Sequence, residues 1–338
     1  MKQFPDIKNC PGTLAAGYET YSPTALRRMF NNKKVSHLLD FSNDANSRVL
    51  INENVGHISI SGVQEKLSAI VTKGKVCLAP EGVQSRYIIK PAPDDKRLNY
   101  RNHLPANEHL TMQIARQVYG IVTAENALIF FQNGKPAYIT KRFDIKADDT
   151  KIKQEDFASL AQKTNETHGK QFKYTGSYTD MGALFQKYVA AWQVEISKFF
   201  RLILFNYVFS NGDAHLKNFS LQQSENGDYV LSPAYDLLNT SLHIQDDVFA
   251  LEEGLFGKEF HSDIYLQKGQ PCKDDFVDFG KMIGIPEIQI EKIMRDFLTV
   301  QFMVYDLTNN SFLNEKLKRM YIRSYEERLR RLRSSSYE

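Results

Sequence analysis

One stretch constrains the fold of this chain most. It is an apolar segment that leads into a polar loop and then into two short strands. The segment 199–209 has the length and composition of a buried helix, which would hold the following loop rigidly from behind. That loop carries Asp213 and, five positions later, Asn218. Alternating runs on either side of the turn at 225–228 predict a hairpin, and Asp236 follows its second strand.

These three polar residues are the kinds of group that phosphoryl transfer from ATP requires. One carboxylate orients the attacking hydroxyl group, while an amide and a second carboxylate hold Mg²⁺ on the phosphates. Protein kinases carry them as D-x-x-x-x-N on a loop, with the metal-binding aspartate further along the chain. Asp213, Asn218 and Asp236 have that order and the first spacing. Because D-x-x-x-x-N also arises by chance and Asn-Gly-Asp also forms an ordinary tight turn, the prediction depends on the rest of the chain.

The length and composition predict a protein of two lobes. A chain of 338 residues exceeds what one hydrophobic core usually organises, and its 42% apolar and 25% charged residues are typical of globular proteins. The first residues lack an apolar leader, and no apolar run reaches the roughly eighteen residues of a membrane span. Three widely spaced cysteines form neither a disulfide framework nor a metal-ligand pair, so we expect a cytoplasmic protein without membrane contact.

The first half of the chain predicts a small antiparallel sheet with one good helix. The predicted strands occupy 59–71 (with a tight turn at Gly62), 76–78, 87–91, 127–131 and 137–144. A glycine turn can point backbone N–H groups at phosphates, although an ordinary hairpin explains Gly62 equally well. The helix is predicted over 107–120, with a single apolar stripe and a closing glycine.

Two charged residues of this half have the positions of a kinase ion pair. Lys90 ends an apolar strand before a proline, where a lysine is either solvated or placed to meet phosphates. Glu108 lies in the first helical turn, where it suits the helix dipole and is also placed to pair with Lys90. The backbone at 140–144 is the predicted hinge that reads an adenine edge, and the following polar segment predicts a boundary between lobes 1–150 and 151–338.

The second half predicts a mainly helical lobe that contains the catalytic loop 210–220 and the metal-binding segment 232–238. Helical spacing of apolar residues occurs at 157–161, 179–191, 195–209, 274–283, 288–305 and 311–332. The polar stretch 163–178 is expected to be a mobile loop, and 249–251 to be a strand near the active face. The basic segment 316–333 is interleaved with glutamates, which favours a solvated helix face over a nucleic-acid surface. The sequence does not indicate a role for residues 1–50 or for residues 245–272.

Several segments, in this order, resemble the HipA-type serine/threonine kinase toxins of bacteria. They are 59–66 (SISGVQEK), 87–91 (YIIKP), 107–108 (NE), 141–144 (KRFD), 154–157 (QEDF), 211–220 (NGDAHLKNFS) and 232–238 (SPAYDLL). The resemblance covers about residues 55–240. It implies an α+β, two-lobed protein-kinase-like fold, with a small, mainly antiparallel N-lobe that has one helix and a larger all-helical C-lobe.

The resemblance also implies roles for individual residues. Asp213 would be the catalytic base, Asn218 and Asp236 the Mg²⁺ ligands, and Lys90, paired with Glu108, a ligand of the ATP phosphates. The other residues expected to bind the nucleotide are Ser61, Gly62, Val63, Gln64, Lys141, Phe143, His215 and Lys217. Ser59 and Ser61 would be autophosphorylated.

The same resemblance implies partners. Family members act in toxin–antitoxin modules with HipB-like helix-turn-helix antitoxins, through which alone they meet DNA, and phosphorylate aminoacyl-tRNA synthetases, which halts translation. Only 58 residues precede Ser59, too few for the N-terminal subdomain of full-length family members. In this respect the chain is more similar to the short HipT-type kinases, in which a separate small HipS-like protein supplies that subdomain. The sequence leaves open the substrate, the dominant serine of the Ser59–Ser61 pair, the neutralising partner and the oligomeric state.

Two other readings are possible from the residues. One is a catalytically silent nucleotide-binding scaffold for a DNA-bound antitoxin, against which the complete set of Asp213, Asn218 and Asp236 argues. The other is a small-molecule or lipid kinase, against which the wording of the Ser-x-Ser-Gly loop argues.

Overall fold

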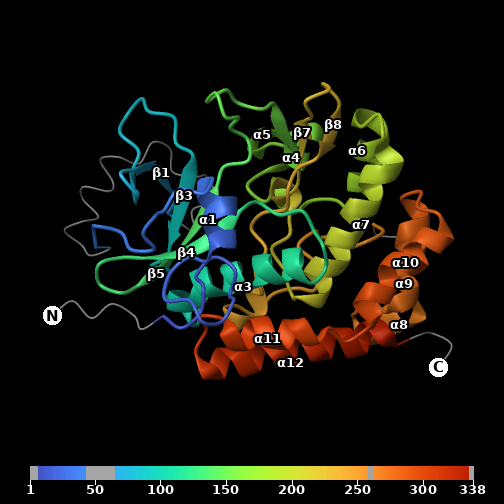
Figure 1. Ribbon diagram of the computed structural model, residues 1–338. Coiled ribbons are helices and arrows are strands. Elements are labelled where there is room, and N and C mark those ends of the chain that lie inside the picture. Colours follow the sequence, from blue (N-terminus) through green and yellow to red (C-terminus); the bar gives the residue numbers. More distant parts are fainter. Residues whose placement is uncertain (1–6, 43–64, 258–261, 335–338) are drawn as a thin grey trace.

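The antiparallel sheet at one end of the molecule and the helices at the other are evident in Figure 1. The computed structural model describes residues 7–42, 65–257 and 262–334. No helix within these ranges is both long enough and apolar enough to cross a membrane.

The larger sheet has the strand order β2-β1-β3-β5-β4, and each neighbouring pair is antiparallel. Its strands are β1 (Leu67–Thr72), β2 (Lys75–Leu78), β3 (Tyr87–Pro91), β4 (Asn126–Phe130) and β5 (Pro136–Lys141). These strands confirm the prediction from the alternating runs. The predicted turn at Gly62 and the strand before it lie outside the described residues.

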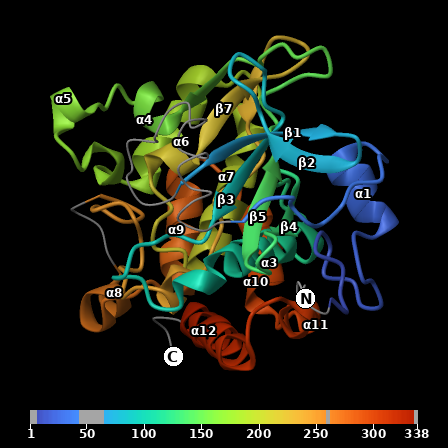
Figure 2. The same ribbon diagram turned by 90° about the vertical axis from the view of Figure 1, so that its left-hand side faces the viewer.

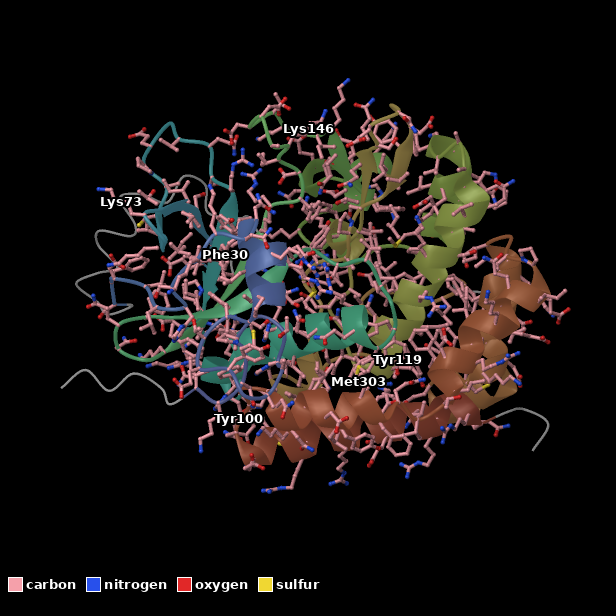
Figure 3. The ribbon with its side chains drawn as sticks, in the orientation of Figure 1. Phe30, Lys73, Tyr100, Tyr119, Lys146 and Met303 are labelled. Atoms are coloured by element: carbon pink, nitrogen blue, oxygen red, sulfur yellow. The ribbon has the colours of Figure 1, made fainter. Side chains whose placement is uncertain are left out.

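Period-two alternation gives this sheet two apolar faces. Leu128 and Tyr138 belong to the core formed with α3 (Leu104–Gln117), whereas Ile129 and Ile139 belong to a separate core formed with α1 (Pro23–Phe30). Figure 2 shows these strands with α1 and α3 beside them, and Figure 3 labels Tyr119 of the core formed with α3 and Phe30 of the core formed with α1. Among the described residues before 150, α1 is therefore present in addition to the expected helix α3, whereas one helix was expected in the N-lobe.

The second half of the chain is mainly helical, as predicted. Its helices are α4 (Phe157–Leu160), α5 (Asn165–His168), α6 (Tyr178–Tyr188), α7 (Trp192–Val208), α8 (Asp263–Lys268), α9 (Lys273–Met282), α10 (Glu287–Leu298), α11 (Phe302–Asn310) and α12 (Glu315–Arg333). Short 3-10 helices also occur: η1 (Arg101–His103) directly precedes α3 in the first half, and η2 (Phe172–Tyr174), η3 (Leu216–Asn218) and η4 (Thr240–Leu242) lie in the second half. Helix α7 is buried over most of its circumference, which matches its apolar sequence.

The helical half also contains a small sheet, so the expectation of an all-helical C-lobe is wrong in this respect. Strands β6 (Gln154–Asp156), β7 (Ser220–Gln223) and β8 (Tyr229–Leu231) form an antiparallel sheet in that order. The hairpin β7–β8 was predicted from its turn. Strand β6 was missed because three polar residues give no alternation. The division of the chain at residue 150 remains a prediction.

Three local predictions were wrong. The helix predicted over 288–305 is broken between α10 and α11, where Thr299 and Val300 are β-branched and the Thr299 hydroxyl bonds the Arg295 carbonyl instead. The predicted loop 163–178 contains α5 and η2. The strand predicted at 249–251 is absent because the chain there runs into turns, with positive φ at Gly254 and Gly257.

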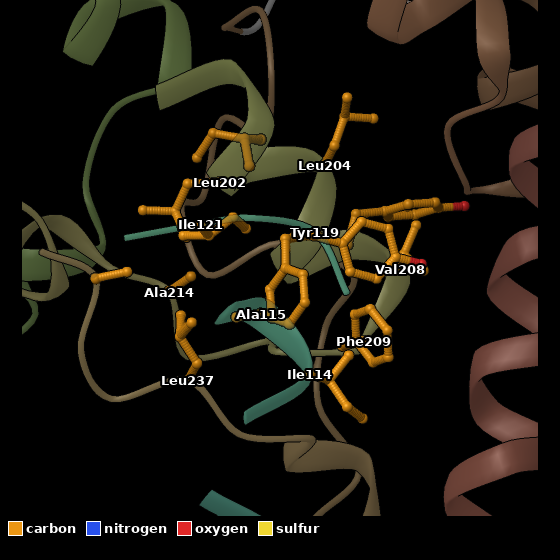
Figure 4. Close-up of a cluster of buried hydrophobic side chains, with 14 of the residues drawn as sticks. Ile114, Ala115, Tyr119, Ile121, Leu202, Leu204, Val208, Phe209, Ala214 and Leu237 are labelled. Carbon is orange, nitrogen blue, oxygen red and sulfur yellow. The ribbon is translucent and has the colours of Figure 1, made fainter. Parts of the chain in front are cut away.

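The central core packs against the two segments that carry Asp213 and Asp236. Figure 4 shows one apolar cluster that includes Ala115 of α3 and Val208 of α7 together with Ala214 and Leu237. Ala214 directly follows Asp213, and Leu237 directly follows Asp236. The core therefore fixes the backbone on which both carboxylates are carried.

The aromatic core around α7 predicts a large effect of truncation. Phe199 is fully buried against the rings of Phe157, Phe185 and Phe219. Phe199→Ala is therefore expected to lower the free energy of unfolding by about 3–5 kcal/mol, measured by urea denaturation. The matched change Phe302→Ala, at a ring that is 79% exposed, should change it by less than about 0.5 kcal/mol. Equal effects of the two substitutions would contradict this description of the core.

Candidate active site

The loop that carries Asp213 has a backbone conformation that requires particular residues at several positions. Ser210 has a left-handed φ of 51°, and the Asn211 amide donates to Asn206 Oδ1 over 2.8 Å. A Cβ on Gly212 would lie 2.6 Å from the carboxylate of Asp246, so only glycine fits. The Gly212 N–H donates to the Thr240 hydroxyl, which ties the loop to η4.

Asp213 stands at the open side of this loop. Its Oδ1 accepts a hydrogen bond from the Tyr174 hydroxyl over 2.8 Å, and 48% of its side-chain surface is exposed. Burial of the group raises its pKa, whereas the Tyr174 hydrogen bond and the charge of Lys173 act in the opposite direction. The Asp213 carboxylate is thus partly accessible to solvent, and one of its two oxygens is held by a hydrogen bond.

His215 and Asn218 lie on the same loop, around η3. The Asn218 Oδ1 accepts from the His215 backbone N–H over 3.2 Å. His215 is 6% exposed, and its Nε2 lies 2.9 Å from Lys173 Nζ. Burial, followed by the charge of Lys173, lowers the pKa of His215 to about 3, so the ring is neutral near pH 7.

A buried ion cluster joins the sheet to this loop region. Lys90 Nζ lies 2.6 Å from Glu108 Oε1 and forms a second, shorter ion pair with Asp236. Burial opposes the charge on Lys90, but the two carboxylates outweigh it and raise the pKa of the amine. For Glu108, burial outweighs the charge of Lys90 and raises the pKa. For Asp236, burial acts in the same direction, but the charges of Lys90 and Lys66 outweigh it and lower the pKa to about 2. The predicted Lys90–Glu108 contact is therefore present, and Asp236 shares it.

Both ends of α3 are tied to the segment that carries Asp236. Near the first end, the Asn107 side chain donates to the Asn239 carbonyl over 2.8 Å and accepts from the Asn239 N–H over 3.1 Å. Beyond the other end, the Ala124 N–H donates to the Ala234 carbonyl over 2.8 Å. Asp236 itself has a left-handed φ of 56°, a conformation that these contacts hold in place.

The remaining predicted contact residues lie at the edges of the site. Phe143 and Tyr235 face each other with ring centroids 5.8 Å apart. Lys141 turns its amine away, to Asn31 Oδ1 over 2.8 Å, so a nucleotide contact would have to come from its backbone. Lys217 pairs with Asp156 over 2.6 Å. Lys217 and Tyr235 line a shallow polar cleft, whose other lining residues are Asp144, Lys151, Ile152, Gln154, Glu155, Asp156 and Ser220.

The predicted glycine-turn residues Ser59, Ser61, Gly62, Val63 and Gln64 lie outside the described residues. Lys66, which is described, is close enough to Asp236 to contribute to its lowered pKa.

Sequence reasoning missed the residues that support the site from other segments. Lys173 and Tyr174 come from the stretch expected to be a loop, and Asp246 from a segment without an assigned role. Asn107 stands in the segment 107–108 that carries the resemblance, but no role was predicted for it. None of these contacts has a local pattern, because each joins residues far apart in the chain.

The fold is that of a two-lobed, kinase-like protein. The chain belongs to the family described as HipA-like C-terminal domain, which matches residues 58–302. It is 28% identical to a Haemophilus influenzae protein named "Putative kinase" over 91% of each chain. It is 30% identical to "Putative kinase Y4dM" of Sinorhizobium fredii over 59% of this chain and 49% of that protein.

Two solved structures share the fold. The HipA of Shewanella oneidensis, determined with HipB and operator DNA, superposes with a TM-score of 0.60 at 18% identity, covering 86% of this chain and 70% of that one. The Helicobacter pylori proinflammatory kinase CtkA superposes with a TM-score of 0.50 at 16% identity, covering 78% of this chain and 93% of that one.

The buried ion cluster predicts a pH-dependent loss of stability when its cation is removed. Lys90→Met leaves Glu108 buried without a counter-charge and is expected to lower the free energy of unfolding by about 3–5 kcal/mol near pH 7.5. Without Lys90 the pKa of Glu108 lies further above its unfolded value, so protonation at lower pH recovers part of the stability. The deficit measured by denaturation should therefore be smaller at pH 5 than at pH 7.5.

The matched control is Lys75→Met, which removes an exposed pair with Asp40. Its effect should stay below about 1 kcal/mol at both pH values. A Lys90→Met deficit that does not change with pH would contradict the assigned role of the buried carboxylate.

Proposed function

We propose that this protein is an ATP-dependent protein kinase that transfers the γ-phosphoryl group to a serine hydroxyl of a protein substrate. The observation that carries the proposal is the ion cluster in which Lys90 joins Glu108 and Asp236, beside the loop that holds Asp213. A lysine in this position neutralises phosphate charge, and a carboxylate on the loop faces the acceptor. Membership of the HipA-like family and the kinase names of the relatives support it.

The residues present fit a magnesium ion on the ATP phosphates. Asp236 has a pKa lowered to about 2, so its carboxylate is ionised, and 30% of its side-chain surface is exposed. Asn218 presents an amide oxygen on the same loop as Asp213. Both are hard oxygen ligands of the kind Mg²⁺ takes. When bound, the ion would neutralise charge on the phosphates and orient them.

In the proposed step the serine oxygen attacks the γ-phosphorus while its proton passes to Asp213. A bond forms between that oxygen and phosphorus, and the bond from phosphorus to the β-phosphate oxygen breaks, which releases ADP. Lys90 lowers the energy of the charge on the phosphates throughout. The raised pKa of Asp213 makes it a better proton acceptor than an ordinary aspartate.

The other end of the nucleotide would lie at the polar cleft. The facing rings of Phe143 and Tyr235 suit the base, and Gln154 Oε1 is buried without a hydrogen-bond partner among the described residues. That oxygen is an acceptor for an N–H group of a ligand. The backbone at 140–144 would supply the hinge contacts, and Lys217 and His215 would face the phosphates.

The biological role that we propose is that of a toxin in a bacterial toxin–antitoxin module. The substrate would be an aminoacyl-tRNA synthetase in the cytoplasm, whose phosphorylation stops translation. A HipB-like antitoxin would bring the complex to DNA, as in the Shewanella oneidensis assembly that contains HipA, HipB and operator DNA. The paired serines Ser59 and Ser61 favour a HipS-like small inhibitor as a further partner.

Autophosphorylation of Ser59 or Ser61 would limit the activity. A phosphoserine adds a charge of about −1.5 to −2, which would repel the ATP phosphates if it lies beside them. Lys66, which is described and follows these serines in the sequence, contributes to the lowered pKa of Asp236.

The test is the intact mass of the purified protein before and after incubation with Mg·ATP. The unchanged protein is expected to gain phosphoryl groups that map to Ser59 or Ser61, and chelation of Mg²⁺ should abolish the gain. Asp213→Asn should reduce the rate roughly 100-fold or more, because the base is removed. Asp228→Asn, at an exposed residue of the β7–β8 turn, serves as the matched control and should transfer normally.

Nucleotide binding without transfer in the unchanged protein would favour the silent scaffold. Equal transfer by the unchanged protein and Asp213→Asn would show that Asp213 is not the base.

A further inference from the structure

Helix α12 packs against the start of the catalytic loop. The Tyr325 ring stacks on Phe209, the residue that precedes Ser210, with ring centroids 5.2 Å apart and an interplanar angle of 13°. Tyr321 and Tyr325 are both fully buried, and the Tyr321 hydroxyl lies 2.9 Å from Thr111 Oγ1 of α3. Figure 1 shows α12 running past the end of α7 from which the loop starts. The core therefore fixes this helix relative to both α7 and α3.

Two polar side chains of α12 hold Ser210, the first residue of that loop. Ser324 and Arg328 are four residues apart and so lie on one face of the helix. Ser324 Oγ lies 2.9 Å from Ser210 Oγ, and Arg328 Nε donates to the same oxygen over 3.1 Å. The guanidinium lies over the Tyr207 ring at 5.1 Å and donates to Gln270 Oε1 over 3.3 Å, which keeps it in place. Both side chains thus hold a residue whose left-handed φ costs free energy.

Ser324 also contacts the segment that follows Asp236. Its hydroxyl accepts from Asn239 Nδ2 over 3.2 Å. In the next residue, Thr240, the N–H and the hydroxyl both donate to the Ser210 carbonyl, over 3.0 and 2.9 Å. One hydroxyl group of α12 therefore connects the loop that carries the proposed base with the segment that carries the proposed metal ligand.

We propose that Ser324 and Arg328 are positioning residues for phosphoryl transfer. They fix Ser210 and, through Ser324, Asn239, and hence the separation of the base from the metal-binding carboxylate, on which an in-line transfer depends. A misplacement of about 1 Å at such a site can lower a rate roughly 100-fold. The inference rests on the proposed kinase function. It extends the functional part of the chain to a helix beyond residues 58–302, the region that the family matches.

The kinetic test compares two substitutions of nearly equal shape at position 324. Ser324→Thr keeps the hydroxyl group, whereas Ser324→Val has a methyl group in its place. In phosphate incorporation from Mg·ATP, Ser324→Val should lower kcat roughly tenfold relative to Ser324→Thr, with a KM for ATP within about twofold. Both new residues are β-branched and have a similar helix propensity, so a general loss of helix stability would affect the two alike.

The second variant removes the guanidinium group. Arg328→Ala should lower kcat by a similar factor, because Ser210 loses its charged donor. Arg323→Ala, at an exposed residue of the same helix, is the matched control and should leave kcat unchanged. Thermal unfolding of each variant establishes that it is folded.

Hydrogen exchange reads the position of the loop without any need for activity. In the whole chain, peptides that cover 210–218 are followed by mass spectrometry, and they contain the Gly212 N–H that donates to the Thr240 hydroxyl. Ser324→Val and Arg328→Ala should each speed exchange in this segment roughly tenfold. The two controls described above, which keep both contacts of α12, should exchange like the unchanged protein.

The outcomes separate this inference from the proposed function. Equal kcat in Ser324→Val and Ser324→Thr, unchanged kcat in Arg328→Ala, or unchanged exchange of the loop in either loss variant each overturns the inference. If the unchanged protein transfers no phosphate, the proposed function fails and the catalytic role of α12 fails with it. The exchange data then decide by themselves whether α12 holds the loop in place.

Discussion

The pairing of Lys90 with two carboxylates is the interaction on which the rest of the structure depends. Lys90 is 4% exposed, so its charge would be strongly destabilising without the carboxylates, and the charge of the buried Glu108 would be strongly destabilising without the amine. The three groups come from strand β3, helix α3 and the segment after β8, so the charges can be satisfied only when all three elements meet. The cluster thus couples the position of the sheet to that of the segment that carries Asp236 in the helical half.

The cluster is reinforced by contacts that leave helix α3 little freedom. Asn107 exchanges two hydrogen bonds with the backbone of Asn239, and the chain after α3 pairs with Ala234. Moving α3 relative to the segment that carries Asp236 would break these buried bonds, and moving it away from the sheet would break the Lys90–Glu108 pair. Such a movement would cost several hydrogen bonds at once, so α3 is poorly suited to act as a switch. Control of the proposed activity is better sought in segments that the cluster does not fix.

Local patterns in the sequence were sufficient to predict most elements and the charged centre. Alternation predicted the sheet, helical spacing predicted α3 and α7, and the order of Lys90, Glu108 and Asp236 predicted a shared site. The failures have physical reasons: β6 is too short to alternate, and the break between α10 and α11 depends on a hydroxyl that bonds the preceding turn. A periodic pattern records which face of an element is buried, and it does not record how neighbouring elements meet.

The residues around the catalytic loop illustrate that limit most clearly. Tyr174 and Asp213 are 39 positions apart, and they meet because the turn at Gly176 is held by the backbone near Glu252. In the sequence, that turn is a polar stretch with no apolar period, which is also how a free loop looks. Its structure comes from backbone hydrogen bonds and one left-handed glycine, neither of which depends on a hydrophobic face. A polar segment beside a site of this kind therefore has to be judged by what its backbone can bond.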